Sequence, residues 1–228
     1  MVLRFCLGQL LLTDGAVSDN RYHLTVFAGW TTLMSTDISW VTTEQLLAMP
    51  DDGVDRELIR GELREIPMIK LNRFHTRTVS RLTYILERWL DSQPDPCGEV
   101  HTGEVGTILR RDPDSTVGID VAYFSAETIA RQTDQTTLIE GAPRLAVEAL
   151  SLSDKVGEIH EKVREYLSTG VEMVWIVDPY FKTIQVHRRA VAPVTYNSEH
   201  RVDGGDVLPG LDFAVADVFH RPADVSHQ

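Results

Sequence analysis

The sequence predicts an α/β protein in which a mixed central β-sheet is flanked by helices. Apolar runs typical of buried strands occur at 117–124 and 145–150, and helical periodicity occurs at 72–92 and again from about residue 154. From residue 145 onwards the pattern reads as a strand, a helix and a second strand. The chain has 228 residues, of which 43% are hydrophobic and 25% charged, and this suits one globular domain with a sizeable core.

The N-terminal segment differs in character from the rest of the chain. An apolar patch follows Arg4, but no small-residue cleavage site comes after it, which argues against a signal peptide. A second methionine, Met34, comes just before the part of the sequence that is typical of a globular domain. We therefore predict that residues 1–33 are an upstream extension or a loose arm, and that a single domain spans 34–228.

The first half of this domain begins with a short helix that Thr42 or Thr43 can cap and Pro50 ends. The apolar side chains of the longest helix recur at helical spacing, at Val79, Leu82, Ile85, Leu86, Trp89 and Leu90. The expected elements are a helix at 42–50, a β-hairpin at 55–67, a helix at 72–92 and strands at 99–110 and 117–124, while 125–140 is ambiguous.

The second half contains the most informative segment. Side chains of 145–150 alternate between two faces, and Glu148 lies inside this apolar run. Ser151 or Ser153 can cap the helix that follows, and Gly170 can end it. Two strands are then expected, a nearly continuous apolar one at 171–179 and a hairpin partner at 183–189.

Charge and cysteine content narrow the functional class. The formal net charge is −12, which argues against a protein that coats nucleic acid, because such binders show a basic footprint. The net charge does not exclude an enzyme that contacts nucleic acid only briefly, or one that places metal ions between itself and the phosphate. With Cys6 and Cys97 as the cysteines, no disulfide framework is expected, which favours a reducing cytoplasm. No apolar run reaches the roughly 18 residues of a membrane span, so no membrane association is expected.

Two acidic residues stand alone within apolar strands. Glu148 could be a water-facing glutamate on an edge strand. However, such a run is typical of a strand buried on both faces, where a carboxylate must be paired, hydrogen-bonded or bound to metal. Asp120 interrupts the run at 117–124 in the same way. Two acids in this setting favour a shared site, and hard cations such as Mg²⁺ prefer carboxylates and water.

Two basic side chains leave alternatives open. Lys162 falls on the flank of the apolar stripe of its helix, beside Tyr166. It can reach along the sheet towards Glu148, or it can form a surface pair with Glu158 four residues earlier. His75, at the start of the longest helix, can be a core histidine or a ligand.

Several blocks of the sequence together resemble a known family. They are "ELIRGELRE", a histidine that opens a long helix, "GIDVAYFS" and "LAVEALSLSDK…EKVREYLSTGVEMVWIVDP". These blocks are similar to the Uma-two family, which belongs to the PD-(D/E)XK superfamily of restriction-endonuclease-like nucleases. The resemblance covers about residues 40–190, and its last block is the most specific. It implies a restriction-endonuclease-like fold, with a mixed central sheet flanked by helices.

The resemblance also implies roles for single residues. Asp120 and Glu148 match the two acids of the divided nuclease motif and would bind metal. The usual lysine, two residues after the second acid, is replaced by Leu150, and Lys162 matches the family's displaced lysine. The proline that usually precedes the first acid is replaced by Ile119, which removes no chemical group.

Three further residues match the family pattern. Glu57 would be an additional metal ligand, and His75 and Tyr166 would have accessory roles. The implied activity is phosphodiester hydrolysis by an endonuclease that uses Mg²⁺ or Mn²⁺, with DNA as the expected substrate. The alternative is a catalytically inactive nuclease fold that serves as a binding or assembly module, which the net charge favours. A homodimer is expected by analogy with the superfamily.

Overall fold

A computed structural model describes residues 26–27, 30–31, 40–67, 72–133 and 137–219. The chain divides into two units, Met1–Ser39 and Trp40–Gln228. In the first unit, the short strands β1 (Val26–Phe27) and β2 (Trp30–Thr31) pair antiparallel. The proposed start at Met34 lies outside the described residues. Across the described ranges, no helix combines the length and the apolar character that crossing a bilayer requires.

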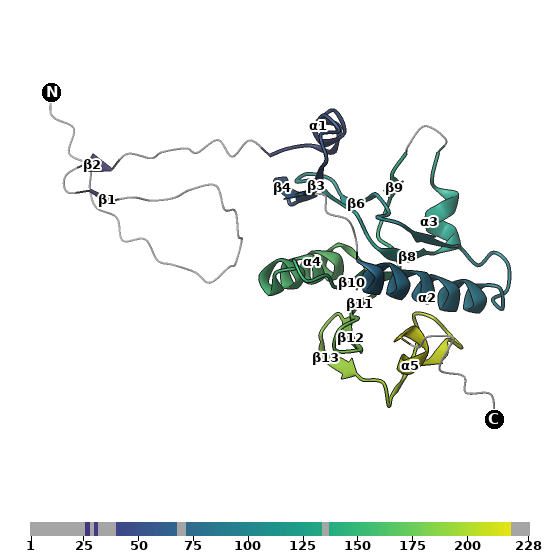
Figure 1. The fold of residues 1–228 in the computed structure, drawn as a ribbon. Helices are drawn as coiled ribbons and strands as arrows, with labels where there is room; N and C mark the ends of the chain where they lie inside the picture. Colours follow the sequence, from purple (N-terminus) through teal and green to yellow (C-terminus); the bar gives the residue numbers. More distant parts are fainter. Residues whose placement is uncertain (1–25, 28–29, 32–39, 68–71, 134–136, 220–228) are drawn as a thin grey trace, which may run out of the picture. The chain divides into compact units, whose positions relative to one another are not determined.

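The second unit contains two main sheets and the helices around them (Figure 1). The six-stranded sheet has the spatial order β13 (Val191–Tyr196), β12 (Thr183–Arg188), β11 (Met173–Asp178), β10 (Leu145–Ala149), β8 (Val121–Phe124) and β5 (Glu99–Thr102). The five-stranded sheet has the order β4 (Glu62–Pro67), β3 (Val54–Ile59), β7 (Ser115–Val117), β6 (Thr107–Arg110) and β9 (Ile139–Glu140). The remaining described elements are β14 (Arg201–Asp203), β15 (Asp212–Ala214), α1 (Thr43–Leu47), α2 (Arg73–Leu90), α3 (Ala126–Ala130), α4 (Val156–Thr169) and α5 (Val215–Phe219).

The predicted mixed sheet is confirmed. Strand β10 pairs parallel with β11 and antiparallel with β8, and α4 forms the crossover between β10 and β11. Because β10 has neighbours on both sides, Glu148 is not on an edge strand, and that interpretation of the sequence is wrong. Every residue of β10 is buried, as its apolar pattern indicates.

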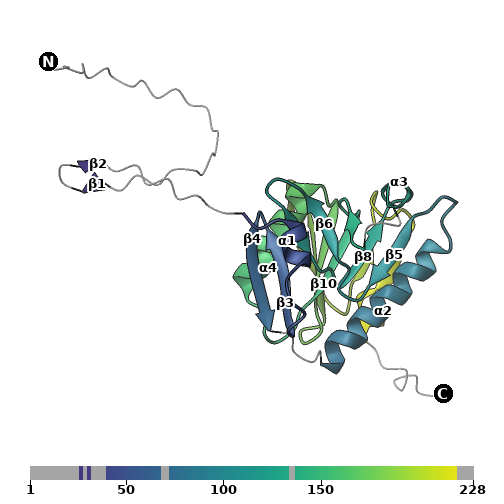
Figure 2. The ribbon, with the colours of Figure 1, turned by 90° about the horizontal axis from the view of Figure 1, so that it is seen from above.

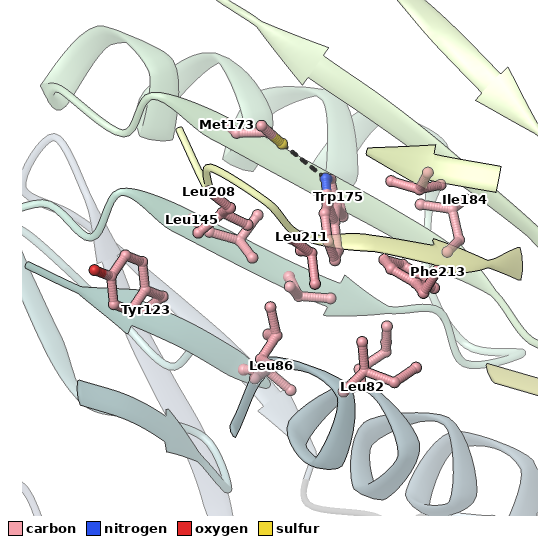
Figure 3. Close-up of a cluster of buried hydrophobic side chains, with 14 of the residues drawn as sticks. Leu82, Leu86, Tyr123, Leu145, Met173, Trp175, Ile184, Leu208, Leu211 and Phe213 are labelled. Carbon is pink, nitrogen blue, oxygen red and sulfur yellow. Dashed lines mark hydrogen bonds between the residues drawn. The ribbon is translucent and has the colours of Figure 1, made fainter. Parts of the chain in front are cut away.

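Helices α2 and α4 cover opposite faces of the six-stranded sheet, as Figure 2 shows on either side of β8 and β10. Alternate residues of β10 separate accordingly, since Leu145 and Val147 pack in the cluster with α2, while Ala146 packs with α4. Figure 3 shows the cluster on the α2 side. In this cluster the Trp175 indole N–H donates to the Met173 sulfur at 2.9 Å.

The N-terminal end of α2 is fixed by a side chain. The Asn72 Oδ1 accepts hydrogen bonds from the backbone N–H groups of Phe74 and His75, which satisfies donors that the helix itself leaves unpaired. The apolar stripe of the helix is buried as predicted, with Leu82, Ile85, Leu86, Trp89 and Leu90 in the core and Val79 packed against it. The capping of α1 by Thr42 is also confirmed, as a capping box with Gln45.

Two local predictions are wrong. Residues 99–110 are not one strand, because the chain turns at Gly103 and Glu104, with φ of 94° and 59°, and β5 and β6 join different sheets. The cap of α4 is Lys155, which makes no side-chain capping bond, rather than Ser151 or Ser153. Ser151 instead forms a local turn with Asp154. The predicted C-terminal glycine of α4, Gly170, is confirmed with φ of 113°.

A buried carboxylate fastens α4 to the five-stranded sheet. Glu165 is fully buried, and its Oε2 accepts from the Arg60 Nε at 2.7 Å, next to the turn between β3 and β4. Its Oε1 accepts from the Ser115 hydroxyl on β7 at 2.6 Å and lies 3.2 Å from the Arg110 Nε on β6. The second sheet is therefore tied to the helix through charged groups.

Exchange of Glu165 for glutamine should lower the free energy of unfolding by about 1–3 kcal/mol, because the amide can still accept from Ser115 but carries no charge for the arginines. The Arg60 side chain is 54% exposed and can rehydrate, which limits the loss. Chemical denaturation measures the difference. Glu127→Gln, in an exposed pair with Arg131, should stay within about 0.5 kcal/mol of the parent. Equal stability of the two variants would contradict this account.

Candidate active site

The residues singled out in the sequence converge beside the six-stranded sheet. Asp120 directly precedes β8, and Glu148 lies on the neighbouring strand β10. The backbone N–H of Ala149, the residue after Glu148, donates to Asp120 Oδ2 at 2.7 Å. This hydrogen bond connects Asp120 to the strand that carries Glu148. Glu57 comes from β3 and Lys162 from α4. Residues of β3, β10 and α4 therefore meet Asp120 at the start of β8.

Glu148 is a buried carboxylate with two nearby partners. The Tyr166 hydroxyl donates to Glu148 Oε1 at 2.5 Å, and the Lys162 Nζ lies 3.4 Å from the same oxygen. Burial raises the pKa of Glu148 to about 8; Lys162 opposes this shift, and the charges of Asp120 and Glu57 add to it. The attraction of Lys162 is therefore smaller than the effect of burial, and this carboxyl group takes up a proton more readily than an exposed glutamate.

Lys162 bridges the acids of the two sheets. Its Nζ lies 2.9 Å from Glu57 Oε1 and donates to the Gly118 carbonyl at 3.2 Å. Burial alone would lower the pKa of Lys162, but the charges of Glu148 and Glu57 outweigh it and raise the pKa well above its usual value. The lysine is therefore charged. The surface pair with Glu158 does not form.

The lysine that does pair with Glu158 is Lys155, at 2.8 Å. The side chain of Lys155 is 76% exposed, whereas that of Lys162 is 15% exposed. Lys155 at the N-cap and Lys162 within α4 thus have different environments, and Lys162 is the one that lies next to Glu57 and Glu148. The sequence spacing alone allowed both interpretations, because a residue on the flank of a helical stripe can turn either way.

His75 is held against Asp120. It is buried, and its Nε2 lies 3.2 Å from Asp120 Oδ2, the oxygen that also accepts from Ala149. The hydrogen bond to Asp120 raises the pKa of His75, although burial opposes the shift. Asn72 sets the position of the helix end and therefore of the ring. The contact places His75 in the site rather than in the apolar core.

Two further acids lie near the site and were not singled out from the sequence. Burial and the charge of Asp120 raise the pKa of Glu104 to about 7. Burial and the charge of Glu57 raise the pKa of Asp55. A side chain on Gly118 would come within 2.8 Å of the Glu104 Oε2, so glycine at this position admits the carboxylate. Glycine at 118, two residues before Asp120, is a sequence feature on which this position of Glu104 depends.

The donor set fits a divalent cation in its chemistry. Burial, with the neighbouring carboxylates adding to it, raises the pKa values of Glu104 and Glu148, and a hard cation bound here would stabilise their charged forms. The hydrogen bonds and the ion pair described above involve Oδ2 of Asp120 and Oε1 of Glu148. They do not involve the second oxygen of either carboxylate. Within the described ranges, no three His, Cys, Asp or Glu residues are already grouped as a metal site.

This fold, with carboxylates and a lysine gathered beside its central sheet, is that of a restriction-endonuclease-like protein. Residues 43–216 match the Uma2 family, described as "Putative restriction endonuclease", and the chain belongs to this family. The resemblance seen in the sequence is therefore confirmed. Family membership supports a nuclease function. No curated protein matches the sequence.

A solved structure shows the same fold. It is the crystal structure of a "putative nuclease belonging to DUF820" from Anabaena variabilis ATCC 29413. The TM-score is 0.65 at 20% sequence identity, and the alignment covers 78% of this chain and 97% of that chain. At this identity the likeness establishes the fold, and the chemistry has to be argued from the side chains of this protein.

Proposed function

We propose that this protein is a metal-dependent endonuclease that hydrolyses phosphodiester bonds in DNA. The observation that carries the proposal is the position of the Lys162 amine, 3.4 Å from Glu148 and 2.9 Å from Glu57. A charged lysine beside acids from two sheets is costly to bury for stability alone. In a member of a restriction-endonuclease family, such a group is more readily explained by catalysis.

Asp120 and Glu148 would hold Mg²⁺ or Mn²⁺, with Glu57 as an additional ligand. When bound, such an ion lowers the pKa of a water ligand and polarises a phosphoryl oxygen. The net charge of −12 is consistent with a site that tolerates phosphate only when a cation is present. It also implies weak binding to DNA through phosphates alone.

The chain's own side chains would orient the reacting groups. Lys162 can donate to the attacking water or to the phosphate, and so stabilise the charge that develops in the transition state. The hydrogen bond from Tyr166 fixes the rotamer of Glu148. His75, together with the N–H of Ala149, fixes Asp120. Tyr166 and His75 are therefore positioning residues in this proposal.

Metal binding provides a direct test. Mn²⁺ at about 100 times its Kd should stabilise the protein by about 2.7 kcal/mol, which corresponds to roughly 5–10 °C in Tm for a chain of this size. Asp120→Asn keeps an oxygen that can accept from Ala149 but loses the charge, so it should abolish the shift. Asp212→Asn, in an exposed pair with Arg201, should keep the shift unchanged.

The same measurement separates the proposal from a non-catalytic role. A protein that retains the nuclease fold only as a binding or assembly module has no need of a functional cation site. If the parent protein shows no shift with Mn²⁺ or Mg²⁺ at any concentration, the endonuclease proposal fails. If Asp120→Asn retains the full shift, the cation binds elsewhere and the assignment of Asp120 is wrong.

A further inference from the structure

Two exposed phenylalanine side chains belong to segments that contact each other at the N-terminal end of α2, which also carries His75 of the candidate active site. Phe181, in the turn between β11 and β12, is 82% exposed, and Phe74, in the first turn of α2, is 44% exposed. The ring of Tyr180 contacts Phe74 edge to face, with centroids 5.9 Å apart. Single exposed apolar residues are ordinary on a protein surface. Here the chain brings aromatic rings from two distant segments together.

The backbone segments that carry these rings are tied to the site. Phe74 directly precedes His75, whose ring contacts Asp120 at 3.2 Å. The amide of Asn72, which caps α2, donates to the Tyr180 hydroxyl at 2.8 Å and thereby ties the turn to the helix end. The turn itself is held by Asp178, whose Oδ1 accepts hydrogen bonds from the backbone N–H groups of Tyr180 and Phe181 at 2.8 and 2.9 Å.

Two cationic side chains lie next to these rings, in addition to the Asp178 carboxylate in the turn. The guanidinium of Arg73 lies over the Phe74 ring, 4.7 Å from its centroid, and Lys182 is exposed beside Phe181. Exposed aromatic faces with nearby cations are the groups that proteins use to bind single-stranded nucleic acid. A duplex keeps its bases stacked inside, so it offers no base face to such a surface.

We propose that Phe74 and Phe181 form a stacking surface for unpaired bases, and that single-stranded DNA is the preferred substrate of this site. The inference rests on the proposed endonuclease function. A protein with a net charge of −12 gains little affinity from phosphate contacts. Base stacking supplies affinity that does not depend on net charge, and it holds the strand beside Asp120.

Binding can be measured without cleavage in the Glu148→Gln background. The probe is a fluorescent oligodeoxythymidylate about 12 nucleotides long, compared with a duplex and with an abasic strand of the same length. We expect the thymidylate to bind at least about tenfold more tightly than either. Adding Phe181→Ala should weaken thymidylate binding by about 5- to 150-fold and leave duplex binding unchanged. Phe181→Trp should retain binding.

Tyr84 offers a matched control on the same helix. Its ring is 51% exposed and has the guanidinium groups of Arg81 and Arg88 at 5.1 and 5.8 Å. It lies ten residues after Phe74, roughly 15 Å along the helix axis. Tyr84→Ala should leave binding of all three probes unchanged. With Arg73 and Lys182 as the phosphate contacts, log K should fall with log salt with a slope of about −1.4.

Tighter binding of the duplex, equal binding of the abasic strand, or no effect of Phe181→Ala would overturn the inference. These outcomes are distinct from failure of the endonuclease proposal. If the parent protein binds thymidylate through Phe181 but cleaves no DNA with Mn²⁺, the nuclease proposal alone fails. If it cleaves duplex DNA at least as fast as single strands, and Phe181→Ala cleaves as well as the parent, the stacking inference alone fails.

Discussion

Replacement of Glu148 by glutamine should reduce hydrolysis of DNA in the presence of Mn²⁺ by about 10³-fold. Glutamine has nearly the same shape and can still accept the hydrogen bond from the Tyr166 hydroxyl. It lacks the negative charge with which the Glu148 carboxylate would hold a cation, and glutamine cannot acquire this charge by losing a proton. The loss should therefore appear in the rate of the chemical step, measured in single turnover on single- and double-stranded DNA.

A matched control lies on the next element. Glu158→Gln removes a carboxylate on α4 whose partner is the exposed Lys155, and it should leave the rate within about twofold of the parent, because exposed pairs contribute little. Equal cleavage by the parent and by Glu148→Gln would point to a contaminating nuclease and would remove the catalytic role of Glu148. Loss of cleavage in both variants would mean that the assay reports surface charge rather than the site.

Exchange of Lys162 for methionine should lower the free energy of unfolding by about 3–5 kcal/mol in the absence of metal. Methionine fills a similar volume, but it leaves Glu57 and Glu148 buried without their cation. Lys155→Met removes the same charge from the same helix at an exposed position and should change stability by no more than about 0.5 kcal/mol. Urea denaturation of both variants gives the comparison directly.

Divalent cations should reverse part of this loss. In the Lys162 variant, Mn²⁺ would supply the positive charge that Glu57 and Glu148 have lost, so it should raise Tm more than it does in the parent protein. Activity should stay low even when stability is restored, because the amine that stabilises developing charge is gone. Similar stability of the Lys162 and Lys155 variants without metal would show that the buried contacts contribute little.

The sequence indicated which side chains lie together better than it predicted the boundaries of the elements. Glu148 stood out because a charge inside an apolar strand needs a partner, and the partners are Lys162 and Tyr166. Lys162 itself was ambiguous, because helical spacing places a residue on a face without saying which partner it meets. The family resemblance favoured the buried position, and the contacts agree with it.

Other features depend on contacts between distant segments and left little trace in the sequence. Glu104 belongs to the site because the chain turns sharply at Gly103 and because Gly118 leaves room for it. Glu165 looked like one of several charges on an amphipathic helix, yet it is buried against Arg60 and Ser115 from the second sheet. The same turn at Gly103 divides 99–110 into two strands that belong to different sheets. The pattern of apolar residues does not show where such a turn occurs.

The division of the site between two sheets has a consequence for how the protein assembles. Asp120 and Glu148 are carried by the six-stranded sheet, whereas Glu57 is carried by the five-stranded sheet and Lys162 by α4. Formation of the larger sheet alone would bring two acids together with no lysine between them. The candidate site is therefore complete only when both sheets and α4 have come together.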